Sequence, residues 1–261
     1  MTAARPNPSA PSGGRSLLPT AVLLVLVCAL MALALPMPVQ ASTTGSGRAA
    51  TEARPVAAFD RVAVAGAIDV VIRQAPSPAV TVTADDNLLP LIETVVEPGT
   101  GGATLRIAVR RGERIRTRAP IRVVVETPEL KAVVGAGSGS LRIEDLETPA
   151  LELALSGSGD AELVGLRAGS LGARMAGSGD VSARGSAAGA LDLAIAGSGD
   201  ASLDALPADD VKISIAGSGD ARVTANRSLQ VRIAGSGDVS WAGQATDVRS
   251  AVAGSGSVRR R

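Results

Sequence analysis

The side chains of this chain that could do chemistry are carboxylates and arginines. The sequence contains no histidine, which removes the commonest general base and the usual zinc ligand. Carboxylates capable of acid–base work on a glycosidic bond stand next to each other at Asp85-Asp86, Glu144-Asp145 and Asp209-Asp210. Each pair falls in a predicted turn, and only Phe59 and Trp241 could stack on a sugar. We therefore expect no enzyme and no cofactor.

A second set of carboxylates recurs at a fixed spacing, each at the end of a Gly-Ser-Gly-Asp tetrapeptide: Asp160, Asp180, Asp200, Asp220 and Asp238. Gly-Ser-Gly-Ser at 137–140 and 254–257 begins and ends the series, and the first glycines are 20, 20, 20, 20, 18 and 19 residues apart. These aspartates either cap the backbone N–H groups of their own bend or form a ladder for Ca²⁺. We favour capping and expect no metal, because calcium-binding glycine-rich repeats have a shorter period and more ligands per turn.

Arginines form a third group, in which only Glu113 offsets the charge: Arg110, Arg111, Arg114, Arg116, Arg118 and Arg122. Guanidinium groups bind phosphates and carboxylates well, so the first five are candidate contacts for an anionic polymer such as lipopolysaccharide or peptidoglycan. The alternative is a solvated loop between strands. Three further arginines at 259–261 are interpreted as a charged protection of the last strand edge.

The residues on either side of each tetrapeptide alternate between apolar and polar, as in Leu191-Asp-Leu-Ala-Ile before one and Ala201-Ser-Leu after it. This alternation is typical of a strand with one buried face, and glycine supplies the positive φ of a sharp bend. A period of about 20 residues without a helical pattern predicts stacked coils. We predict an all-β fold, a right-handed parallel β-helix, with the hand taken from the general rule for parallel crossovers.

The residues before the regular repeats are expected to cap one end of this solenoid. Strands are predicted at 59–65, 70–73, 79–84, 92–96, 104–109 and 121–125, with a helical turn or loop at 86–92. Residues 66–69, Gly-Ala-Ile-Asp, match the later corners at glycine and aspartate, and we interpret them as a degenerate first corner. Irregular coils of this kind cover backbone groups that a bare coil would expose.

The N-terminal part has the order of an export signal. Two arginines precede an unbroken apolar run at 21–35, and small residues end at Ala41. This order describes a secretory signal peptide cleaved after Ala41, although residues 17–35 approach the length of an uncleaved anchor helix. Cleavage would remove Cys28, the only cysteine, and would leave 24 basic against 25 acidic residues. The predicted parts are a signal peptide or membrane anchor at 1–41, a flexible linker at 42–55, a β-helical head at 56–258 and a basic tail at 259–261.

The chain resembles the GIN domain family, the head domains of bacterial auto-transporter adhesins. The resemblance covers about residues 56–258 and rests on Phe59-Asp60, on 66–70 (Gly-Ala-Ile-Asp-Val), on 84–90 (Ala-Asp-Asp-Asn-Leu-Leu-Pro) and on the later Gly-Ser-Gly-Asp repeats. It implies an exported β-helical protein of a Gram-negative envelope. It supplies no catalytic residues.

These observations predict an exported, non-enzymatic interaction module, adhesin-like, in the periplasm or at the cell surface. Its partner is expected to be an envelope glycan or another protein, and a balanced charge gives no reason to expect nucleic acid. Membrane contact is expected only through the N-terminal segment, if that is retained. The main alternative is a structural envelope protein that assembles end to end, and a polysaccharide-active enzyme is a third class.

Overall fold

The structure, a computed structural model, describes residues 42–99 and 101–261, and the predicted signal or anchor segment lies outside them. The described elements are β1 (Ser42–Thr44), β2 (Ala49–Arg54), β3 (Arg61–Gly66), β4 (Asp69–Gln74), β5 (Ala79–Asp85), the 3₁₀ turn η1 (Leu89–Leu91), β6 (Ile92–Gly99), β7 (Gly102–Val109), β8 (Arg114–Arg116), β9 (Arg122–Thr127), β10 (Ala132–Gly137), β11 (Leu141–Glu144), β12 (Glu147–Gly157), β13 (Ala161–Gly177), β14 (Val181–Gly197), β15 (Ala201–Gly217), β16 (Ala221–Gly235), β17 (Val239–Ala242), β18 (Asp247–Gly254) and β19 (Val258–Arg260). Within this part of the chain, no helix has the length and apolarity needed to span a bilayer.

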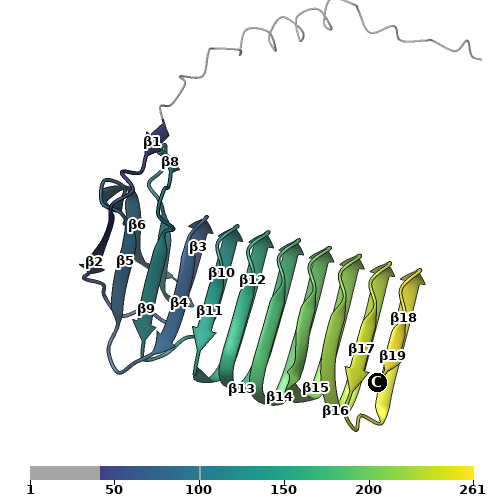
Figure 1. Ribbon diagram of the computed structural model, residues 1–261. Helices are drawn as coiled ribbons and strands as arrows, with labels where there is room; N and C mark the ends of the chain where they lie inside the picture. Colours follow the sequence, from purple (N-terminus) through teal and green to yellow (C-terminus); the bar gives the residue numbers. More distant parts are fainter. Residues whose placement is uncertain (1–41, 100) are drawn as a thin grey trace, which may run out of the picture. The chain divides into compact units, whose positions relative to one another are not determined.

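Parallel strands stack in register on two faces of a solenoid, which confirms the predicted β-helical fold (Figure 1). One face holds β3, β10, the later halves of β12–β16, and β18. The other holds β4, β11, the earlier halves of β13–β16, β17 and β19. The first glycine of each corner pairs with its equivalent one coil later, and Gly66 pairs with Gly137. Residues 66–69 are therefore the first corner, as predicted.

The backbones of successive coils approach so closely at these corners that a side chain does not fit. Gly197 has a φ of +140°, and a Cβ there would clash with the carbonyl oxygen of Gly177 on the preceding coil. The amide of Ser198 donates to the same carbonyl at 2.9 Å. The Gly-Ser-Gly sequence is thus required by the inter-coil hydrogen bond as well as by the bend.

Apolar side chains fill the interior in columns that follow the strand register. One column consists of the residues two positions before each corner glycine: Leu155, Met175, Ile195, Ile215 and Ile233. Each of them is at most 9% exposed, whereas the neighbouring positions in the strand face outward. Trp241 is also buried, at the end of a column that includes Val223. The predicted alternation therefore gives the observed core.

Residues 75–131 are inserted after the first coil and fold back over its end. β7 and β9 extend the parallel stack beyond β3 and β4. β6 then pairs antiparallel with β7, while β5 pairs antiparallel with both β9 and β2 (Figure 1). This confirms the predicted strands and the capping role, and η1 occupies the predicted turn at 86–92.

Parts of the predicted flexible linker and of the predicted basic tail are strands. The predicted flexible linker at 42–55 contains β1, which pairs with β8, and β2, which pairs with β5. Their small and polar residues show no apolar alternation, and they are strands because neighbouring edges offer backbone hydrogen-bond partners. For the same reason most of the predicted basic tail belongs to β19, which pairs with β17. Arg260 there stacks over Trp241, with the guanidinium carbon 5.0 Å from the ring centroid.

Replacing Gly197 by alanine should lower the free energy of unfolding by about 1–3 kcal/mol, because the new Cβ meets the neighbouring backbone at a positive φ. Urea denaturation followed by circular dichroism measures this change. The control is Ala196→Ser, since Ser156 occupies the equivalent outward position of another coil. Equal stability of Gly197→Ala and the wild type would contradict the close approach of the coils.

Candidate functional site

The corner aspartates tie each coil to the next. The amide of Asp180 donates to Oδ1 of Asp160 at 2.9 Å. The same bond recurs at 2.8 Å for the amides of Asp200, Asp220 and Asp238, each toward the preceding aspartate. We predicted that each aspartate caps its own bend, and this detail is wrong. The serine amide of the bend already donates to the preceding coil, so the carboxylate accepts the amide of the following coil instead.

The positions of the corner aspartates fit a ladder of Ca²⁺ sites less well than their spacing in the sequence suggested. Ca²⁺ prefers about six to eight oxygen ligands. A coil contributes at most one corner carboxylate, and one oxygen of it already accepts an amide hydrogen bond. Among residues 42–99 and 101–261, no three His, Cys, Asp or Glu side chains are placed to hold a metal ion together.

A buried carboxylate fastens two loops at the capped end. Asp85 is fully buried; its Oδ1 accepts the amide of Gly47 at 2.7 Å, and its Oδ2 accepts the amides of Arg118 at 2.9 Å and Ala119 at 3.2 Å. The bond from the Arg118 amide, with smaller contributions from the other two amides, holds the pKa of Asp85 below its ordinary value against the opposing effect of burial. Asp85 is therefore an ionised structural anchor.

The next two residues hold the chain that follows β1. Asn87 accepts the amide of Ser46 at 2.8 Å and donates to the carbonyl of Thr44 at 2.9 Å. Asp86 accepts the hydroxyl of Ser46 and pairs with Arg48 at 2.8 Å, and both contacts, the hydroxyl first, lower its pKa. The predicted carboxylate pair Asp85-Asp86 thus organises loops.

One member of each of the other two carboxylate pairs is engaged in ion pairs. Glu144 accepts Arg142 at 2.6 Å and Arg73 at 2.7 Å, and these contacts hold its pKa below the ordinary value. Asp210 pairs with Arg227, which lowers the pKa of Asp210 to about 2. In the part of the chain that the structure describes, these pairs connect strands and do not converge on a common substrate position.

The predicted arginine cluster divides into residues with and without partners. Arg110 donates to the carbonyl of Pro90 at 2.8 Å and lies 3.6 Å from Glu93. Arg122 lies on β9, opposite Asp69 of β4. The remaining members are exposed, and no described carboxylate lies within ion-pair distance of them: Arg111, Arg114, Arg116 and Arg118. We term residues 110–118 the arginine loop.

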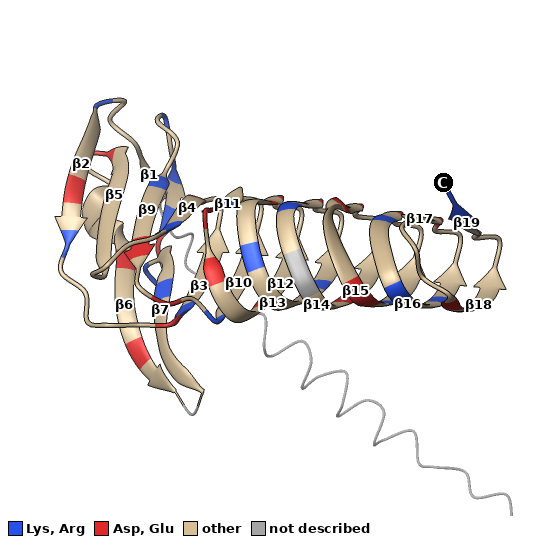
Figure 2. Ribbon diagram, turned by 90° about the horizontal axis from the view of Figure 1, so that it is seen from below, with Lys and Arg blue, Asp and Glu red and all other residues tan. Residues whose placement is uncertain are grey.

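The arginine loop is held in place from two sides. β8 pairs in parallel with β1, and Ile115 packs its side chain against the core. Side chains alternate along a strand, so Arg114 and Arg116 project away from that core. The amide of Arg118 is bound by the buried Asp85. Figure 2 shows basic segments in the capped end of the described chain.

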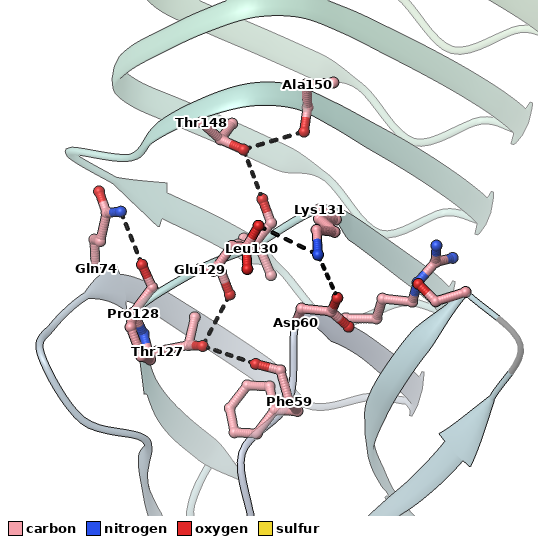
Figure 3. A network of polar contacts seen from close by, with 12 residues as sticks. Phe59, Asp60, Gln74, Thr127, Pro128, Glu129, Leu130, Lys131, Thr148 and Ala150 are labelled. Atoms are coloured by element: carbon pink, nitrogen blue, oxygen red, sulfur yellow. Dashed lines mark hydrogen bonds and ion pairs between the residues drawn. The ribbon is translucent and has the colours of Figure 1, made fainter.

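The sequence analysis did not identify a second set of polar contacts, made by threonine hydroxyls at the other corner of the first coils (Figure 3). The hydroxyl of buried Thr127 lies 3.1 Å from the carbonyl of Phe59 and 2.9 Å from that of Glu129. Thr148 repeats this one coil later, with the carbonyls of Leu130 at 3.1 Å and Ala150 at 3.2 Å. The signal was the repeated Thr-Pro-x-Leu at 127–130 and 148–151, which lies outside the Gly-Ser-Gly period.

The geometry defines a capped β-solenoid domain in which Asp85, Glu144, Asp210 and the corner aspartates connect separate segments of the chain. The family model described as "Putative auto-transporter adhesin, head GIN domain" matches residues 58–245. The chain belongs to this family, as the sequence resemblance indicated. A search of the curated proteins finds no match to this chain.

Solved structures share this fold over almost their whole length. The chain is similar to "a putative adhesin" from Bacteroides fragilis, with a TM-score of 0.79 and 22% identity over 84% of this chain and 100% of that one. A "putative adhesin" from Parabacteroides distasonis has a TM-score of 0.67 and 23% identity, over 85% and 100%. A "putative lipid binding protein" from the same organism has a TM-score of 0.66 and 25% identity, over 85% and 100%.

Calcium should leave the stability of residues 42–261 unchanged, because the corner carboxylates already accept backbone amides. Thermal unfolding is measured by circular dichroism in EDTA and then in excess Ca²⁺. A rise of several degrees in Tm would mean that the native state binds the ion, and would contradict this account of the column.

Asp85→Asn should lower Tm at neutral pH, because an amide group cannot replace a carboxylate that accepts three N–H groups. The folded state lowers the pKa of Asp85, so its contribution is complete above the ordinary value of 3.8 and is lost as pH falls below it. The gap in Tm between variant and wild type should therefore narrow in acid. Glu113→Gln, in the exposed arginine loop, is the control. A difference in Tm between the variant and the wild type that stays constant or widens in acid would show that Asp85 is not the ionised anchor.

Proposed function

We propose that this chain is an exported, non-enzymatic, adhesin-like interaction module of the bacterial cell envelope. Residues 1–41 would act as a signal peptide or membrane anchor, and residues 56–258 would be the head, in the periplasm or at the cell surface. The observation that carries this proposal is the rigid pair of sheets, whose outward side chains form regular rows from coil to coil. Membership of the adhesin head family supports it.

The two faces offer different chemistry to a partner. Small side chains follow each other beside the corner on one face: Ala136, Ser156, Ala176, Ala196 and Ala216. The other face carries Arg142, Glu162, Ser182, Ser202 and Arg222 in the equivalent row. A repeating and rigid surface binds an extended polymer without ordering its own side chains, which lowers the entropy cost of many weak contacts. An envelope glycan or another protein would fit such a surface.

The arginine loop would provide contacts to anionic groups of the envelope. Arg111, Arg114, Arg116 and Arg118 are available, while Arg110 is already held by Pro90 and Glu93 and would contribute mainly charge. Arginine suits phosphate and carboxylate because its planar fork can donate two parallel hydrogen bonds.

A structural envelope protein is the second candidate, and the last coil favours it. Val248 and Val252 of β18 are 40% and 42% exposed, although they occupy the register positions of buried residues in β16. An uncovered apolar end of this kind could stack on another molecule. Arg259 and its neighbours oppose stacking of two such ends, because like charges would meet.

The test is binding of fluorescent residues 42–261 to intact cells and to lipid-free peptidoglycan. Saturable retention that unlabelled protein displaces, with no release of sugar fragments, is the expected result. Release of fragments would show an enzyme. Absence of retention, together with concentration-dependent elongation in the ultracentrifuge, would show the structural candidate instead.

A further inference from the structure

We infer that the arginine loop docks the head onto an anionic phospholipid surface. The surface would belong to the membrane that holds residues 17–35 when that segment is not cleaved off. This deepens the proposed function and rests on it only in requiring an exported head with a membrane-associated N-terminal segment. The lipid phosphates would be the groups that the four unpaired arginines contact.

The loop carries a positive charge that the described protein neutralises only in part, through Glu93 beside Arg110 and Asp85 near Arg118. Residues 110–118 contain five arginines against the single acid Glu113, a net charge of +4 (5 − 1). Several other basic side chains at this end pair with carboxylates, among them Arg48 with Asp86, and Arg106 with Glu93 and Glu97. Asp85, whose pKa the charge of Arg118 also lowers, is buried and already accepts three amides. The positive charge of the loop is therefore directed to solvent.

The loop is a rigid platform, which distinguishes it from a solvated connection. Asp85 fixes the backbone at 118–119, β1 fixes the backbone at 114–116, and Ile115 anchors the strand to the core. The amide of Gly45 also donates to the carbonyl of Arg116 at 2.7 Å. Because the backbone is held, contact with a surface costs mainly the rotamer freedom of the arginine side chains.

Chain length places this loop near a membrane whenever the apolar segment is retained. Only residues 36–41 separate the end of the apolar run from Ser42, and six residues span at most about 20 Å. Ser42 is the register partner of Arg114, and Thr44 is that of Arg116. Residues 36–41 would therefore keep the arginine loop within about the length of this short linker from the lipid phosphates. The effective concentration of the phosphates at the loop would then be high.

The experiment is co-sedimentation of residues 42–261 with lipid vesicles, compared with a variant that lacks the four arginines. This part is expected to fold alone, since it corresponds to the whole of a solved relative. The vesicles contain phosphatidylcholine alone or mixed with phosphatidylglycerol. We expect binding only to the anionic vesicles, weakening as salt is raised. R111Q/R114Q/R116Q/R118Q should reduce the partition coefficient about fivefold per arginine, on the order of several hundredfold in total.

The matched control is R167Q/R174Q/R232Q/R259Q, which removes the same charge from the solenoid and should retain most of the binding. An equal loss in this control would assign binding to net charge and overturn the inference. Equal binding to neutral vesicles, or displacement by millimolar inorganic phosphate at constant ionic strength, would overturn it too. Unchanged circular dichroism shows that both variants are folded.

The two proposals can fail separately. If the wild type binds cells and lipid-free peptidoglycan but does not bind anionic vesicles, only the lipid inference is wrong. If the polymer assay fails and vesicle binding still depends on the arginine loop, the lipid inference stands and the interaction partner is the membrane alone.

Discussion

The close approach of main chains at each Gly-Ser-Gly corner is the constraint on which the structure depends. A Cβ at Gly197 would enter the space of the preceding carbonyl, and that carbonyl accepts the next coil's amide. The distance between successive corners sets the distance between successive strands on both faces, because one strand of each coil ends at this bend and the other begins after it. The interior columns then follow, with Leu, Ile, Val and Met stacked on their equivalents. Glycine at this position is thus the condition for a continuous core.

Side chains satisfy the backbone groups that the bends leave without partners. Corner aspartates accept amides of the following coil, and Thr127 and Thr148 donate to carbonyls at the opposite corner. At the capped end, Asp85 does the same for three amides at once. Unpaired backbone polar groups are costly when buried, so the polar residues of this chain are largely structural.

The structural use of most polar side chains also indicates where a binding site can lie. Several charged side chains of the two faces are engaged between coils, as Arg142 is with Glu162 and Glu144 with Arg73, so a ligand at these positions would have to displace existing ion pairs. The arginine loop is different, because its guanidinium groups project from a fixed backbone with no described carboxylate beside them. A regular head domain with a charged platform near its N-terminal strand is the arrangement on which the proposed docking to an anionic membrane rests.

The sequence by itself determined the repeating part, because a local rule governs it: alternation gives the buried face, and glycine at a fixed period gives the corner. It also identified 66–69 as a corner, although 71 residues separate Gly66 from Gly137. The tertiary structure alone decided everything that depends on contacts between distant segments. Residues 42–54 became strands because β8 and β5 offered free edges, and Asp85 became an anchor because two remote loops meet it. The arginine cluster was visible in the sequence, but only the fold separates Arg110, which has partners, from Arg114 and Arg116, which project outward.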